Sequence, residues 1–304
     1  MTVEWSSNAP VDVEAPVMLV AFEGWNDAAD VATNAVEHLE LNWGSTPVAS
    51  INGDEFYNYL EQRPAIRIAE GVPRGLEWPE VSVSVSKPEG LAQDVVLVRG
   101  PEPSLRWRRF AELFVDLADT LGVSQVVLLG AYLSDTPHTR PVPLTGIAFS
   151  KDRAAQMGVT EAEYSGPIGV TGVLQQHFTE VGIPTVSLSA AVPHYVAAPP
   201  NPKATEAVLR WLAESIGVPV PLEQMTGQAA QWVEKVNAAA AEDDDLSDYI
   251  QSLEERSDEA ATAVGRDPEP DRATAADAEA MRMIDGDAIA EEFERYLRGD
   301  DSGL

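Results

Sequence analysis

The segment of residues 134–149, SDTPHTRPVPLTGIAF, carries more reactive side chains than a connection between two strands requires. Asp135 and His138 stand three residues apart, and Arg140 follows them between prolines that restrict the backbone. A carboxylate and an imidazole at this spacing could transfer protons, and the guanidinium could bind an anion. The same groups could equally fix the loop through internal hydrogen bonds and ion pairs, so both interpretations stay open.

Four other segments combine polar side chains with the ends of predicted strands or the starts of predicted helices. In open α/β sheets, ligands bind just outside the carboxyl ends of the strands. We therefore expect these segments and residues 134–149 to line one preformed polar pocket at that edge. They are residues 23–27, 99–102, 164–172 and 194–201.

The pocket hypothesis assigns its residues two roles. The candidates for proton transfer are His138, His194, Glu23 and Asp135. Arg140 and the backbone amides near Gly169 to Gly172 would hold an anion. The candidates for ligand binding are Asn26, Asp27, Arg99, Glu102, Arg140, Tyr164, Gly169, Thr171, Gly172, Tyr195 and Asn201.

Familiar catalytic motifs do not fit the sequence. Ser134 or Ser165 could complete a nucleophilic triad with His138 and Asp135, but neither serine lies in a Gly-x-Ser-x-Gly turn. The glycine-rich run 166–172 matches neither the dinucleotide fingerprint nor the P-loop, and close packing of a helix would explain its glycines equally well. The chain has no cysteine, which excludes a thiol nucleophile and a thiolate metal site. We predict no bound metal and no cofactor.

The first 220 residues alternate between strand and helix patterns. Most apolar runs are continuous, as in strands buried on both faces, so we predict an α/β fold with a mainly parallel sheet flanked by helices. The run VSVSVS alternates strictly and indicates an edge or half-exposed strand. Ser104 is the expected N-cap of its helix. The predicted strands are 17–22, 48–51, 81–85, 95–98, 126–129, 144–149 and 185–188, and the predicted helices are 27–41, 104–121, 170–181 and 204–216.

The composition changes after Pro221, where the sequence loses its strand patterns. From residue 237 to 304 there are 21 acidic residues and 6 arginines, a net charge of −15. The last apolar pattern places Ile289, Phe293, Tyr296 and Leu297 on one helical face. We predict an N-terminal arm (1–16), an α/β domain (17–220), a helical extension (221–260), an acidic linker (261–284) and a C-terminal amphipathic helix with a tail (285–304).

Charge narrows the classes of partner. The net charge of −30, with four lysines in 304 residues, opposes binding to nucleic acid and to anionic membranes. The first apolar run is about six residues long, shorter than a signal or membrane-spanning segment requires. We expect a cytoplasmic protein with neither nucleic-acid nor membrane partners.

Six motifs in consistent order are similar to a known family: AFEGWNDAAD, DEFYNYLEQRP, GPEPSLRW, SDTPHTRP, YSGPIGVTGVL and VPHYVAAPPNPKA. The series resembles the prokaryotic branch of the proteasome assembly chaperone family, and more narrowly an actinobacterial member. The resemblance covers about residues 17–216. It implies a fold similar to purine nucleoside phosphorylases and hydrolases, self-association, and for eukaryotic relatives assistance in assembling the proteasome α-ring.

Two functions of different classes remain open. The first is a non-enzymatic homo-oligomeric assembly protein, with a trimer favoured by the resemblance and proteasome subunits or another protein as further partners. Ring-binding members end in a hydrophobic residue, a tyrosine and any third residue, a tripeptide that the final residues DSGL do not match. Trp43, Trp78 and Trp232 are expected interface anchors. The alternative is a small-ligand-binding protein or an enzyme, a ligase or hydrolase acting on a carboxylate or nucleoside-like compound.

Overall fold

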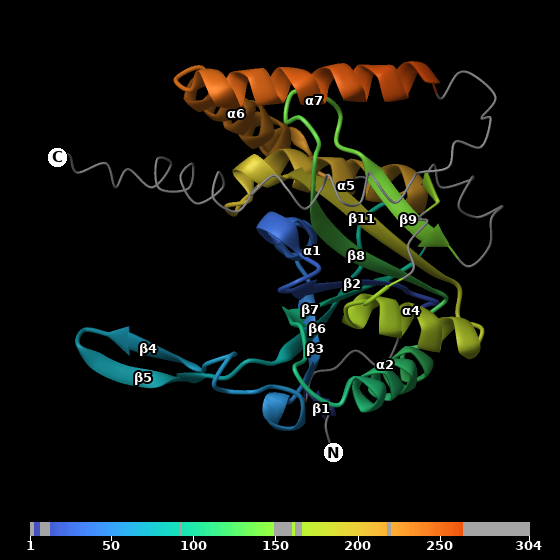
Figure 1. Cartoon of the computed structure of the whole chain (residues 1–304). Coiled ribbons are helices and arrows are strands. Elements are labelled where there is room, and N and C mark those ends of the chain that lie inside the picture. The colour runs from blue at the N-terminus through green and yellow to red at the C-terminus, as the bar shows by residue number, and fades with distance from the viewer. Residues whose placement is uncertain are drawn as a thin grey trace.

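The computed structural model describes residues 3–6, 13–91, 93–148, 160–161, 166–217 and 220–263. These residues form an α/β fold around a nine-stranded mixed sheet, with helices on both of its faces (Figure 1). The strand order is β1-β3-β6-β7-β2-β8-β11-β9-β10. The predicted fold class is confirmed, and the helices that follow it at the C-terminal end are present as well.

Four parallel strands form the centre of the sheet. The apolar runs predicted to be buried on both faces are these strands, and six of the seven residues of β2 are buried. Their side chains alternate between the two faces, since Leu19 and Ala21 pack on one side and Val20 and Phe22 on the other. The central strands are β7 (Val95–Pro101), β2 (Val17–Glu23), β8 (Gln125–Ser134) and β11 (Thr185–Pro193).

The outer strands change the direction of the sheet. On the side of β7 the neighbours pair antiparallel, and beyond β11 the strand β9 is antiparallel with β10 parallel to it. The short strands β1 and β10 have no counterpart in the sequence prediction. The outer strands are β6 (Val81–Ser86), β3 (Thr46–Ile51), β1 (Val3–Trp5), β9 (Leu144–Ala148) and β10 (Thr160–Glu161).

The prediction that VSVSVS forms an edge strand is wrong. Strand β6 lies between β3 and β7, and five of its six residues are buried. Its serines find partners beneath the helix that covers them. Ser84 Oγ donates to Glu40 Oε1 (2.9 Å), and Ser86 Oγ donates to the carbonyl of Trp43 (3.1 Å). Alternation in this strand therefore reflects satisfied polar groups rather than solvent exposure.

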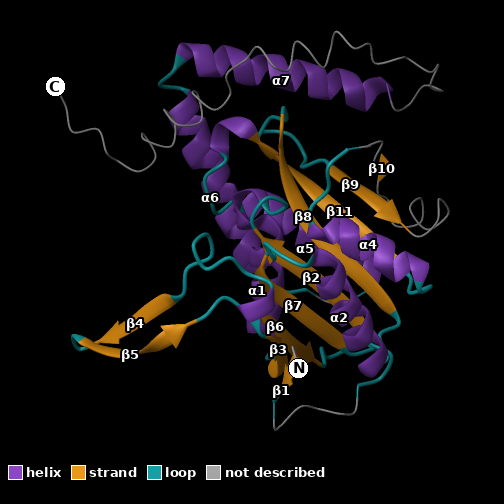
Figure 2. Cartoon of the chain, turned by 60° about the horizontal axis from the view of Figure 1, so that its bottom comes forward, coloured by secondary structure: helices purple, strands orange, loops and turns teal. Residues whose placement is uncertain are grey.

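Two helix pairs cover the two faces of the sheet. Helices α1 (Val31–Trp43) and α5 (Pro202–Ile216) pack together over one hydrophobic core. Helices α2 (Trp107–Thr120) and α4 (Val170–Glu180) pack over the other, as Figure 2 shows. Phe22 and Phe114 are centred 5.7 Å apart in the second core, an edge-to-face contact.

The predicted N-cap of α2 is wrong. The N-cap residue is Arg106, which adopts a left-handed conformation (φ 55°) and makes no side-chain capping bond. The preceding loop is fixed differently, because the amide of Leu105 donates to the carbonyl of Phe56 (2.9 Å) and the Trp107 indole donates to the carbonyl of Pro103. These contacts accompany an N-cap that lies two residues beyond Ser104.

A two-stranded hairpin projects from the sheet (Figure 1, Figure 2). It consists of β4 (Ala65–Ala69) and β5 (Val72–Glu77), and all residues of both strands are exposed. We call residues 65–77 the arm. The sequence analysis did not predict it, because Gly71, Pro73 and Gly75 interrupt the strand pattern.

Beyond Pro221 the described residues contain helices and no strand. Helix α6 (Glu223–Ala240) packs on α5, and α7 (Asp244–Ala263) packs on α6 and on Tyr195 through a third cluster of buried residues. No described helix is both long enough and apolar enough to cross a membrane. Most of the predicted acidic linker and all of the predicted C-terminal helix lie outside the described residues, and the domain boundaries stay predictions.

Helix α5 depends on a buried asparagine at its start. Asn201 is 1% exposed, and its Oδ1 accepts from the amide of Ala204 (3.0 Å). We expect Asn201→Ala to lower the free energy of unfolding by about 1–2 kcal/mol, because the first turn of the helix loses its cap. Asn201→Asp keeps an accepting oxygen and is the control. Urea titration measures both, and an alanine variant as stable as the wild type would contradict this role.

Candidate functional site

The structure divides the predicted pocket into two groups of contacts. One surrounds the carboxyl ends of β2 and β7 and joins residues 23–26 to Glu102 and to the start of α4; we call it the carboxyl-edge cluster. The other joins residues 135–140 to Tyr195 and to helices α5, α6 and α7; we call it the loop–helix network.

The carboxyl-edge cluster is built from hydrogen bonds between strand ends. Glu102 donates its amide to the carbonyl of Glu23 (3.1 Å) and accepts from the amide of Val170 through Oε1 (2.8 Å). Asn26 Nδ2 donates to Thr171 Oγ1 (2.8 Å). The Glu102 carboxylate thus accepts a hydrogen bond from an amide at the start of α4. This is the place where the sequence analysis predicted an external anion.

Two glycines allow the cluster to close. A Cβ atom on Gly130 would stand 2.5 Å from Asn26 Nδ2, and one on Gly169 would stand 2.9 Å from Glu102 Oε1. Gly172 likewise faces Ile168, at 3.0 Å from an ideal Cβ. These glycines serve close packing, which is one of the two interpretations that the sequence left open.

Arg99 turns away from Glu102. Its Nε donates to Glu40 Oε2 (2.6 Å) beneath α1, on the face of the sheet opposite α2 and α4. Glu23 has a raised pKa, chiefly because its surroundings desolvate it, with repulsion from Asp30 adding to the shift and attraction to Arg99 opposing it. Glu23 therefore remains the proton-transfer candidate at this edge whose pKa is shifted toward neutrality.

Asp27 belongs to the start of α1. It is 3% exposed, and its carboxylate accepts from the amides of Ala32 (2.6 Å) and Thr33 (3.3 Å) and from the Thr33 hydroxyl. Burial raises its pKa to about 6, and those hydrogen bonds limit the rise. Asp27 and Asn201, both predicted to bind ligand, each accept hydrogen bonds at the start of a helix.

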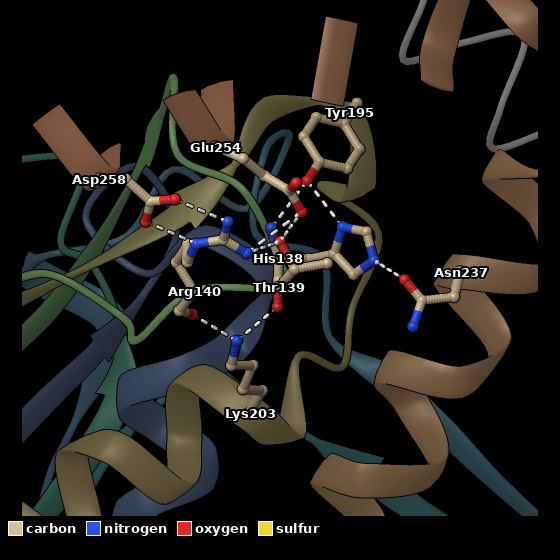
Figure 3. Close-up of polar contacts among 8 residues, drawn as sticks. All are labelled: His138, Thr139, Arg140, Tyr195, Lys203, Asn237, Glu254 and Asp258. Carbon is tan, nitrogen blue, oxygen red and sulfur yellow. Dashed lines mark hydrogen bonds and ion pairs between the residues drawn. The ribbon is translucent and has the colours of Figure 1, made fainter. Parts of the chain in front are cut away.

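His138 is the centre of the loop–helix network (Figure 3). It is 2% exposed, and its backbone amide donates to Tyr195 Oη (2.7 Å). The Tyr195 hydroxyl then directs its own proton to His138 Nδ1 (2.8 Å), so Nε2 carries the ring proton and donates to Asn237 Oδ1 (2.9 Å). Burial lowers the His138 pKa, with the bond to Asn237 opposing the shift. The neutral ring joins the loop to α6.

Arg140 joins the same loop to α7. Its Nε and Nη2 donate to the two carboxylate oxygens of Asp258 at 2.8 Å each, and Nη1 lies 3.4 Å from Glu254 Oε1. The Thr139 hydroxyl also donates to Glu254. The pKa of Asp258 is lowered, chiefly by its hydrogen bonds from Arg140. The guanidinium predicted to bind an external anion is thus engaged by two carboxylates of the chain.

Lys203, in the first turn of α5, joins that helix to the loop. Its ammonium donates to the carbonyls of His138 and Arg140, as Figure 3 shows. Burial lowers the Lys203 pKa, which attraction to Glu206 partly offsets. The loop therefore contacts α5, α6 and α7 at once, through side chains of opposite charge and through its own backbone.

Asp135 and His194 lie at the outer margin of this network. Asp135 Oδ1 accepts from the Tyr249 hydroxyl (3.1 Å), and it lies 4.0 Å from His194 Nε2. Arg256 lies 4.0 Å from the second oxygen of Asp135. The contacts of Asp135 run to α7 and to His194, whereas those of His138 run to Tyr195 and Asn237, so the D-x-x-H spacing does not produce an Asp–His pair.

The two groups use most of the predicted site residues without joining them in one pocket. Tyr164 lies outside the described residues. A cavity of about 470 Å³ does border the loop–helix network, between residues 138–140 and helices α6 and α7. Across the part of the chain that the structure describes, no three His, Asp or Glu side chains are grouped as a metal site would require.

The sequence analysis missed the partners on the helical extension, Asn237, Glu254 and Asp258. Glu254 and Asp258 stand four residues apart on α7, so they share one face of the helix and meet Arg140 together. Two acidic residues four positions apart could have indicated a partner for an arginine, but acidic residues are abundant throughout the helical extension. Its composition alone therefore does not distinguish the two that contact the loop.

Together the fold and the site define a class: an α/β protein whose polar loops support a helical extension. The PAC2 family model matches residues 21–240, and the chain belongs to the PAC2 family. A proteasome-assembly chaperone homologue from Mycobacterium tuberculosis is 46% identical, with 77% of this chain and 99% of that one covered at a TM-score of 0.73. A PAC2 family protein from Streptomyces avermitilis is 45% identical, with 77% and 99% covered at a TM-score of 0.72.

The fold extends to an archaeal protein of much lower identity. A proteasome activator from Pyrococcus furiosus is 16% identical and has a TM-score of 0.63 over 78% of this chain and 98% of its own. No curated protein matches the chain in sequence. The predicted membership of the proteasome assembly chaperone family, with actinobacterial relatives, is confirmed.

The ion pairs of Arg140 provide a test of how α7 is held. We expect Arg140→Gln to increase amide hydrogen exchange in Asp244–Ala263 roughly tenfold while exchange in β2 is unchanged, because the central strands do not depend on the helix. Arg210→Gln is the control, since that arginine pairs with Glu206 within α5. Unchanged exchange in α7 would contradict a supporting role for Arg140.

The neutral state of His138 makes stability depend on pH. Its folded pKa lies below the ordinary value of 6.5, so the unfolded chain takes up a proton first as the pH falls. We expect the wild type to lose free energy of unfolding relative to His138→Gln from about pH 7.5 downward through 6.5 toward the lowered folded pKa. Urea titrations at several pH values measure the difference. The contribution of Asp27 to the pH dependence is the same in both proteins and cancels in the difference. Parallel plots of unfolding free energy against pH for the two proteins would refute the effect.

Proposed function

We propose that the chain is a non-enzymatic assembly protein that forms a homo-oligomer by placing its arm on the carboxyl edge of a second copy. The observation that carries this proposal is the exposed apolar arm. Ile66, Ile68 and Leu76 are each more than half exposed, and Ile66 stands directly opposite Leu76 across the two strands. A two-stranded hairpin is marginally stable alone in water, so an apolar arm of this kind favours a partner.

The carboxyl edge supplies a surface of matching character. Trp25 is 68% exposed, and Leu105 and Ile168 are about half exposed around the carboxyl-edge cluster. The arm leaves the sheet at this same edge, because the end of β3 pairs with the start of β6 there. It extends away from its own sheet (Figure 2), which favours contact with another copy.

Charge is compatible with a second copy as the partner. The arm carries Arg67 and Arg74 against Glu70 and Glu77, a net charge of zero in a chain of net charge −30. An arm without net charge escapes the repulsion that acidic surfaces exert on one another, and every other copy of this chain presents such a surface. An arm on a neighbour's edge would be a head-to-tail contact, which forms a ring when its rotation closes, and a trimer is the expected ring from the family resemblance.

The loop–helix network supports a role without catalysis. His138 and Arg140, the strongest catalytic and anion-binding candidates, direct their hydrogen bonds to α6 and α7. The relative from M. tuberculosis is a proteasome-assembly chaperone homologue, which favours proteasome subunits, or another protein assembly, as the further partner of the oligomer. No nucleic acid or membrane is expected to take part, given the charge of the chain.

Substitutions in the arm test the proposal directly. The double variant Ile66→Asp with Ile68→Asp should sediment as a monomer near 32.7 kDa, while the wild type sediments as a multiple of that mass. The reason is that two buried carboxylates would be desolvated in the interface. Val181→Asp, an exposed apolar position at the far end of α4, is the control and should remain oligomeric.

A second variant identifies the receiving surface. Trp25→Asp should dissociate the oligomer as the arm variant does, since the proposed contact joins these two surfaces. Far-ultraviolet circular dichroism confirms that each variant is folded. A wild-type monomer at micromolar concentration would refute self-association, and an oligomer that survives both variants would refute the arm contact.

A further inference from the structure

A groove of about 660 Å³ runs between α1 and α6, on the face of the molecule away from α2 and α4. One face of α1 and one face of α6 form its two walls, and residues at the start of α5 form its floor. Leu41 on the first wall is 78% exposed, the highest value among the large apolar side chains of the described residues. Trp232 supplies apolar surface on the second wall, where Met225 is 8% exposed.

The groove is held open by its own contacts. His38 Nε2 lies 2.7 Å from the carbonyl of Pro221 and spaces α1 from the start of α6. Trp232, on the α6 wall, also contacts His138, with the two ring centres 6.2 Å apart in an edge-to-face arrangement. Two helices with a shared floor and fixed spacing are the receptor that an amphipathic helix requires.

The dimensions fit a segment of this chain that lies outside the described residues. Ile289, Phe293, Tyr296 and Leu297 recur at the spacing of one helical face over nine residues, about 12 Å of helix. The lining residues of α1 run from Asn34 to Asn42, also nine residues and about 12 Å. The apolar face is therefore as long as the α1 wall, and it is shorter than the α6 wall, whose lining residues run from Gln224 to Lys235 over about 16 Å.

Charge favours the same match. The segment 285–304 is acidic, and the groove lining holds one carboxylate, Glu37, together with His38 and Lys235. The cavity beside α7 is lined by Glu254, Glu255 and Asp258 and would repel such a segment. Of these two cavities, the groove between α1 and α6 repels an acidic helix less than the cavity beside α7 does.

The chain is long enough to reach the groove from any direction. Helices α6 and α7 and their connection limit the distance between Ala263 and the groove to about 70 Å. The 25 residues between Ala263 and Ile289 can extend to about 85 Å. A tether of this kind raises the local concentration of the segment at the groove to about the millimolar range.

We propose that residues 285–304 bind as an amphipathic helix in the α1–α6 groove of the same chain. Ile289, Phe293 and Leu297 face Leu41, Met225 and Trp232, and the acidic residues of the segment face solvent. The bound helix covers the exposed apolar surface of α1 and holds α6 against the α/β core. This contact is independent of the arm, so the two proposals fail or succeed separately.

Disulfide trapping in the full-length chain tests the proposal. The sequence has no cysteine, so the pair Leu41→Cys with Phe293→Cys can form a single disulfide. Phe293 is central in the apolar face and lies near the middle of the groove in either helix direction. We expect rapid oxidation to a disulfide within one chain, seen as a faster-migrating monomer on a non-reducing gel.

Two matched pairs serve as controls. Leu41→Cys with Glu291→Cys uses the opposite face of the same helix, and Val181→Cys with Phe293→Cys uses a distant exposed position. Both should oxidise at least about tenfold more slowly than the first pair, because neither brings the thiols together. Equal rates for the three pairs would overturn the proposal, as would a first pair that links two chains instead of one.

Discussion

The structure depends on one constraint, which is that four parallel strands are buried on both faces. Strand β2 has helices above and below it, and its side chains alternate between two separate cores. The buried part of this strand, Val17–Phe22, is accordingly continuously apolar. Chemistry is consequently confined to the strand ends, where β2, β7, β8 and β11 all point the same way. The arm, the carboxyl-edge cluster and the loop–helix network all begin at that edge.

Polar residues at the edge of a buried sheet do not necessarily form an active site. Once α6 and α7 cover the loop that follows β8, its buried polar groups lose water and must find partners within the chain. The buried His138 contacts Tyr195 and Asn237, while the partly exposed Arg140 pairs with Asp258 nearer the surface. The density of histidine, arginine and carboxylate in residues 135–140 is thus explained by the need to hold a strongly acidic helical extension on an α/β core. Glu23 is the proton-transfer candidate at the carboxyl-edge cluster whose pKa is raised, chiefly by desolvation.

Sequence reasoning succeeded where the physical signal is local. All seven predicted strands and four predicted helices of the α/β part correspond to elements of the structure, because burial on two faces and helical spacing leave periodic patterns. It misplaced β6 at an edge of the sheet, because the serines of this buried strand are hydrogen-bonded beneath α1. It also missed the arm, whose glycines and proline interrupt the strand pattern. The candidate site residues stay a prediction, and their contact partners on α6 and α7 were not predicted. Asn237 is 99 positions from His138 and Asp258 is 118 from Arg140, and no local pattern encodes such contacts.

The acidity of the chain links these features. Copies that each carry a net charge of −30 repel one another, and at physiological salt this repulsion acts over about 8 Å. Association must therefore use elements where acid is sparse or balanced by arginine. The arm and the α1–α6 groove are two such elements, while two acids of α7, Glu254 and Asp258, lie near Arg140. Salt would screen the general repulsion more than it weakens the proposed contact of Ile66 and Leu76 with an apolar surface, because burial of apolar groups does not depend on charge. In the proposed oligomer, an apolar arm without net charge is accordingly the means by which so acidic a chain would bind its own copies.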